Sequence, residues 1–283
     1  MKRETLIGTF AIIMSSIVFA LMSFLIKTAP EIDPYKTSLF RFAIGFAILG
    51  TAAMANKISL KFVNSKLLFL RGILGGIAIF IFFYSINKIG IGKGTLISYM
   101  FPVFAVIVSS IFLKEKVGLY KWLLILTSVL GIFLISFSKI NSEFIGFDYN
   151  YLIALFGAMM GGCAITVVKK LRENESSYSI YFAQCTMGFW VVLIPANTVP
   201  VSIGISGGFI LLGIGITATI GQLLMTYSYK YLSVSKGSVL GMLTPVFNVI
   251  LGIIFFQEKF TIVMAIGMIL ILTSCTLIGM NKK

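Results

Sequence analysis

Long apolar runs alternate with short polar gaps along the whole chain. Each run is about 20 residues long, the length that an α-helix needs to cross the hydrocarbon core of a bilayer. The gaps are too short to hold a folded domain outside the membrane. The pattern therefore predicts an all-α membrane protein with ten transmembrane helices, at 5–26, 35–54, 66–86, 93–113, 119–137, 150–168, 178–194, 206–229, 236–255 and 261–279.

Composition supports this interpretation. Of the 283 residues, 58% are hydrophobic and only 11% are charged, whereas about a quarter of the residues of a soluble domain are charged. A soluble chain of this length could not bury so much apolar surface. The first run, 5–26, is too long for the core of a signal peptide, so we expect it to be retained as the first helix.

The net charge of +14 has a topological explanation. In a soluble protein it would suggest nucleic-acid binding, but here the basic residues lie in the gaps between apolar runs. With a cytoplasmic N-terminus, 16 Lys and Arg residues lie inside, 6 lie outside and Arg41 lies within a helix. Because cytoplasmic loops are enriched in Lys and Arg, this predicts a cell-membrane protein with both termini in the cytoplasm and no nucleic-acid partner.

The sequence lacks the groups of residues that usually hold a metal ion or a cofactor. The sequence has no histidine, and its three cysteines lie singly inside apolar runs. Cysteines placed in this way are typical of small buried apolar residues. We therefore expect neither a metal site nor a cofactor.

The two halves of the chain repeat at an offset of 143 residues. Between 84–116 and 227–259, 13 of 33 positions are identical, including both ends of the segment. This predicts two domains, a five-helix repeat at 1–140 and a second at 144–283. Because five is odd, the second repeat must cross the membrane in the opposite direction, an arrangement typical of secondary transporters.

Specific motifs carry a family resemblance. Lys93-Gly94, Pro102-Val103-Phe104 and Glu115-Lys116 recur at the same offset in the second half. With these motifs the chain resembles the drug/metabolite transporter superfamily, EamA-type branch, over nearly its whole length. The resemblance implies transport of small metabolites through a central cavity lined mainly by helices 1, 3, 4, 6, 8 and 9. It also implies that helices 5 and 10 are peripheral and could pair in a homodimer.

Two prolines interrupt the fourth and ninth predicted helices. Pro102 and Pro245 each remove a backbone donor and free one carbonyl, that of Ser98 or Gly241. Either the resulting kinks shape or gate the transport pathway, or they only aid packing. Recurrence in both repeats favours the first interpretation.

Arg41 is the one charge clearly inside a predicted helix, about 10 Å deep at 1.5 Å per residue. Its guanidinium group could bind a substrate carboxylate through two hydrogen bonds, or it could extend to the lipid headgroups. Arg71 lies nearer a helix end, and for this residue we expect the extended, headgroup-directed conformation.

Neutral polar residues complete the candidate substrate pathway. Gln184, the counterpart of Arg41 in the second repeat, and Gln222 and Asn248 should face other helices or a cavity, where they orient a polar substrate or simply join helices. Tyr99 lies on the same helix face as Pro102 and is expected to point at the kink.

The acidic residues suggest the class of substrate. None lies deep within a predicted helix, whereas carriers of cationic drugs commonly use a membrane carboxylate. With Arg41, this favours an amino-acid-like, zwitterionic or anionic metabolite as substrate of a carrier that works by alternating access. An exporter of drugs or cationic metabolites, a channel and a membrane scaffold stay open as alternatives. An enzyme is not expected, because clustered carboxylates, histidine and an activated nucleophile are missing.

Overall fold

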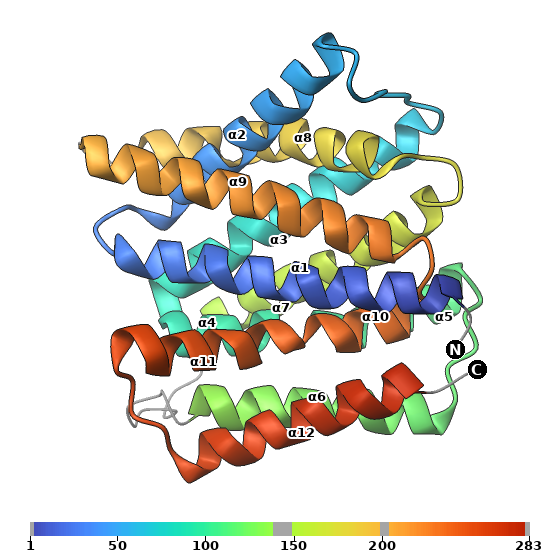
Figure 1. Cartoon of the computed structure of the whole chain (residues 1–283), viewed down its shortest axis with the longest axis vertical. Coiled ribbons are helices and arrows are strands. Elements are labelled where there is room, and N and C mark those ends of the chain that lie inside the picture. The colour runs from blue at the N-terminus through green and yellow to red at the C-terminus, as the bar shows by residue number, and fades with distance from the viewer. Residues whose placement is uncertain (1–2, 138–148, 199–203, 281–283) are drawn as a thin grey trace.

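The computed structural model of the chain describes residues 3–137, 149–198 and 204–280, and all regular structure in these residues is helical (Figure 1). The predicted boundary between the repeats, at 140–144, lies outside this part. The helices are α1 (Arg3–Thr28), α2 (Pro34–Met54), α3 (Ser65–Ile89), α4 (Ile91–Ser98), α5 (Phe101–Phe112), α6 (Leu119–Phe137), α7 (Tyr149–Leu171), α8 (Ser177–Asn197), α9 (Ile205–Ser228), α10 (Val234–Gly241), α11 (Leu243–Phe256) and α12 (Ile262–Met280).

Ten spans in the described residues are long and apolar enough to cross a membrane, which confirms the predicted fold class. The fourth span, Lys93–Phe112, contains most of α4 and all of α5, and the ninth, Val234–Phe256, joins α10 and α11. The other eight spans are single helices.

Local residue choices set several helix boundaries. Asp33 caps α2, because its Oδ1 accepts hydrogen bonds from the backbone N–H of Tyr35 and Lys36 at 2.8 and 3.3 Å. Ser176 caps α8 in the same way through the N–H of Ser179. One residue, Gly90, separates α3 from α4, and its φ of 84° is a conformation that a side chain would strain.

The two repeats interlock rather than lie side by side. α1 of the first repeat packs along α9 of the second, and α7, the counterpart of α1, packs along α3, the counterpart of α9. α2 and α8 lie at one end of the long axis of the bundle, and α6 and α12 pair at the other (Figure 1). This reciprocal pairing is what two related halves with opposite orientations produce.

The helices run roughly across the long axis of the bundle, and both chain termini lie at the same end of the helices, at the right in Figure 1. We call it the termini end; it also holds the connections α2–α3, α5–α6, α7–α8 and α9–α10. The other end, called the far end, holds the connections α1–α2, α3–α4 and α11–α12. Each of the broken spans four and nine therefore has one half-helix at each end.

Candidate functional site

Arg41 points into the bundle and not towards lipid headgroups. Its side chain on α2 is buried, with the residue 8% exposed, and its Nη2 donates to Oε1 of Gln222 on α9 at 3.4 Å. The ring of Phe19 from α1 lies 5.9 Å from the guanidinium carbon, within the range of a cation–π contact. The Nε–H of Arg41 has no hydrogen-bond partner among the described residues.

Arg71 is buried as well, so the expectation that it extends to the headgroups is wrong. The residue is 2% exposed, and its Nη2 donates to Oε1 of Gln184 on α8 at 2.8 Å. Close approach of α3 and α8 explains this, since a Cβ added to Gly76 would lie 2.9 Å from the Cα of Gly188. The side chain is therefore enclosed by α8, and its Nε and Nη1 donors find no partner in the described residues.

One face of α8 packs against α2 and α3 and links the two arginines. Tyr181 and Cys185 pack over Gly45, one turn after Arg41, while Gln184 faces α3. The guanidinium groups of Arg41 and Arg71 are close enough to repel each other. We refer to Arg41, Arg71, Tyr181, Gln184 and Gln222 as the arginine cluster.

No carboxylate from the described residues offsets these two charges. All the described acidic residues lie at helix ends or in connections: Glu4, Glu31, Asp33, Glu115, Glu173, Glu175 and Glu258. A buried charge without a counter-charge is costly, and each arginine at membrane depth carries a penalty of roughly 3 kcal/mol. The glutamine oxygens offset part of this penalty and leave the positive charge in place.

Beside the prolines each span is interrupted for one or two residues, Tyr99 and Met100 in the first and Met242 in the second, whose backbone stays close to helical. α5 begins at Phe101 with Pro102 in its first turn, and α11 begins at Leu243 with Pro245 in its first turn. A proline fits there because the first N–H groups of a helix have no intrahelical partner. In the second break the Gly241 carbonyl accepts a hydrogen bond from the Thr244 hydroxyl at 3.1 Å.

The two breaks meet inside the bundle. Tyr99, which follows α4, packs against a hydrophobic cluster that includes Met242 and Leu243 at the second break. Asn248 lies on α11 beyond Pro245, and its Oδ1 has no partner among the described residues. No hydrogen bond in the described part of the chain joins Tyr99 or Asn248 to the arginine cluster.

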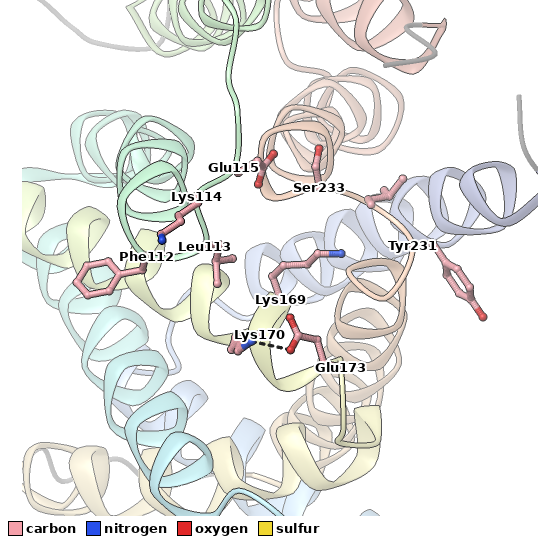
Figure 2. A pocket seen from close by; sticks show the side chains of 10 residues that line it. Phe112, Leu113, Lys114, Glu115, Lys169, Lys170, Glu173, Tyr231 and Ser233 are labelled. Atoms are coloured by element: carbon pink, nitrogen blue, oxygen red, sulfur yellow. Dashed lines mark hydrogen bonds and ion pairs between the residues drawn. The ribbon is translucent and has the colours of Figure 1, made fainter.

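A cavity of about 430 Å³ opens at the termini end. Figure 2 shows it between the end of α5, the end of α7 and the connection from α9 to α10. Lys169 donates to the carbonyl of Tyr229 at 2.9 Å, and Lys170 pairs with Glu173 at 2.7 Å. The lysines and glutamates that line the cavity set its charge.

Glu115 ties the repeats together beside this cavity. Its carboxylate accepts hydrogen bonds from the backbone N–H of Val234 and Ser235 at 3.0 and 3.3 Å and from the Ser235 hydroxyl at 2.7 Å. It thus caps α10 of the second repeat, where the helix dipole favours a negative charge. At the far end the counterpart of Glu115, Glu258, forms an ion pair with Lys27 of α1.

Comparison with known proteins decides the family. A family model described as the EamA-like transporter family matches residues 6–137 and again 149–280. The chain belongs to the EamA-like transporter family. The resemblance on the repeated motifs is thereby confirmed, and so is transport, in place of enzymatic catalysis, as the function of the chain.

Relatives of this EamA-like transporter cover nearly its full length. The pseudopaline exporter CntI of Pseudomonas aeruginosa strain UCBPP-PA14 is 25% identical over 280 residues, which are 98% of this chain and 97% of CntI. Human solute carrier family 35 member G1 is 22% identical over 275 residues, 89% of this chain and 73% of the relative. A crystal structure with 18% identity superposes with a TM-score of 0.80 and covers 97% of this chain and 96% of its own, which shows the shared fold.

Proposed function

We propose that this transporter moves a small metabolite that carries at least one carboxylate, an amino-acid-like zwitterion or an anion, and that the arginine cluster binds it. The observation that carries the proposal is a pair of buried guanidinium groups with unpaired N–H donors and no carboxylate among the described residues that could neutralise them. A substrate carboxylate would supply the missing charge and accept the free hydrogen bonds.

The breaks in spans four and nine supply the proposed movement. Half-helices separated by a short break can tilt independently, and domain or segment motions of this kind open a site to each side in turn. Packing of Tyr99 against the cluster that includes Met242 and Leu243 supports coupled movement of the two breaks. The cavity of Figure 2, at the ends of spans four and six and between spans eight and nine, would then be the exit or entrance at the termini end.

Orientation and direction belong to the same proposal. The excess of Lys and Arg supports a cell-membrane location with the termini end in the cytoplasm, and the name of the relative CntI supports export. A cysteine introduced between Asn56 and Ser65 should react with a membrane-impermeant thiol reagent only from the cytoplasmic side. Labelling of that cysteine from outside intact cells would refute the orientation.

Arg41→Gln tests the function directly. A thermal-shift screen of the purified transporter against a metabolite library identifies a ligand, and uptake into proteoliposomes then measures its transport. We expect Arg41→Gln to lower kcat/KM by about 10- to 100-fold, the loss caused by removing a charged hydrogen-bond partner.

Arg3→Gln is the matched control, because Arg3 is exposed at the start of α1, away from the arginine cluster. It should transport like the unmodified protein. Equal and saturable transport by Arg41→Gln and Arg3→Gln would remove the arginine cluster from the mechanism.

A further inference from the structure

We infer that the substrate carries two anionic groups, and that Arg71 binds the second of them. This inference rests on the proposed function, in which Arg41 binds the first. The starting observation is that Arg71 is the more deeply buried of the two arginines, 2% against 8% exposed.

Each arginine uses only part of its guanidinium group in hydrogen bonds to other described residues. In each case a glutamine from the second repeat takes only Nη2, Gln222 from Arg41 and Gln184 from Arg71. Nε of Arg41 and both Nε and Nη1 of Arg71 have no partner among the described residues. Buried donors are nearly always paired, so these three N–H-bearing nitrogens point to a ligand or ordered water.

Both arginines belong to one site. Tyr181 and Cys185 lie against Gly45, one turn after Arg41, and Gln184 on the same helix accepts a hydrogen bond from Arg71. α8 carries these two residues and Gln184 on one face, at i, i+3 and i+4, between α2 and α3. A single small ligand can therefore reach both arginines.

Charge then selects the class of ligand. A ligand with one carboxylate would leave one of the two buried positive charges unneutralised, at the cost that burial of an unpaired charge carries. A ligand with two acidic groups would neutralise both and remove their mutual repulsion. The chain supplies no substitute from its described residues, since all its described carboxylates lie at helix ends or in connections.

Matched pairs of ligands test this inference. The purified transporter in lipid nanodiscs is titrated with dicarboxylates and with their monoamides, which keep the shape and lose one charge: succinate and succinamate, glutarate and glutaramate, L-glutamate and L-glutamine. We expect at least one dicarboxylate to bind about 10- to 100-fold more tightly than its monoamide, the effect of a charge-assisted hydrogen bond. No preference for the dicarboxylate in any pair would overturn the inference.

Arg71→Gln should abolish that preference, so that the dicarboxylate and its monoamide bind with similar affinities. Gln184→Glu is a second variant of nearly unchanged shape, which places a fixed carboxylate beside Arg71 and should also abolish the preference. Arg3→Gln should retain it. A preference that survives both Arg71→Gln and Gln184→Glu would exclude Arg71 as its origin.

Failure of this inference is distinct from failure of the proposed function. Binding of monocarboxylates that depends on Arg41, without any preference for dicarboxylates, overturns the role of Arg71 and leaves the proposed function intact. Binding of every ligand that is unchanged in Arg41→Gln overturns both.

Discussion

Arg41 and Arg71 are charged residues within membrane-spanning helices, where charges are rare. Each is held by a single glutamine, and the glutamines come from the other repeat. A neutral amide can orient a guanidinium group without neutralising it, which keeps the positive charge available for a ligand. The choice of Gln over Glu at positions 184 and 222 is therefore the residue-scale feature on which the proposed function depends.

Gly75 gives the guanidinium group of Arg71 its space. A Cβ added at this position, one turn after Arg71 on α3, would overlap Nη1 of Arg71 and lie 2.9 Å from Nε2 of Gln184. Gly75→Ala should therefore displace the arginine, lower the free energy of unfolding by about 1–3 kcal/mol as overpacking does, and reduce transport. Thermal unfolding of the purified protein and proteoliposome uptake measure the two effects.

Gly50→Ala is the control for that substitution. Nothing lies within 4 Å of a Cβ added at Gly50 of α2, so the variant should match or slightly exceed the unmodified protein in stability. Equal behaviour of Gly75→Ala and Gly50→Ala would show that the conformation of Arg71 described above is not the functional one.

At the scale of elements, the broken spans α4–α5 and α10–α11 are the parts best suited to move. Each half-helix is short, and Tyr99 at the first break packs against the cluster that includes Met242 at the second. Some contacts of α10 with other elements are polar. Glu115 caps its first turn, and Lys236 donates to the carbonyl of Gly279 on α12 at 2.9 Å. Polar links can break and re-form as the half-helices tilt.

The variants Pro102→Ala and Pro245→Ala test this role. Alanine restores a backbone donor and favours a continuous helix, so each variant should bind substrate with unchanged Kd but transport it severalfold more slowly. Binding in nanodiscs and uptake in proteoliposomes separate the two quantities. Pro195→Ala, which changes a proline inside the unbroken α8, is the control and should leave both unchanged. A normal transport rate in both break variants would reduce the prolines to a packing role.

At the scale of the whole molecule, the sequence predicts the architecture closely and the site only in part. A helix needs about 20 apolar residues for each crossing of a bilayer, so the apolar runs predict the ten spans. The 143-residue repeat likewise indicated two opposed halves, since its offset held over most of the chain. The prolines predict where spans four and nine depart from a regular helix, and the structure has a one- or two-residue interruption beside each of them.

The pairing of arginines with glutamines was not predictable in the same way. Arg71 lies one and a half turns into α3, where an extended conformation is usual, and its partner Gln184 is 113 residues away. What buries Arg71 is the approach of α8, which depends on glycines of two helices meeting face to face. The glycines beside Arg71, at positions 72, 75 and 76, are a local signal of this approach, because small residues favour close helix packing, but they do not identify the partner.

At the scale of the molecule, two oppositely oriented repeats meet at a pair of buried arginines, where we propose that substrate binds. An experimental structure of the transporter with its transported metabolite bound tests this most directly. The account predicts acidic oxygens of the metabolite about 2.9 Å from guanidinium nitrogens of both Arg41 and Arg71. A metabolite bound elsewhere, with the Arg41–Gln222 and Arg71–Gln184 pairs unchanged and no acidic group beside them, would contradict it.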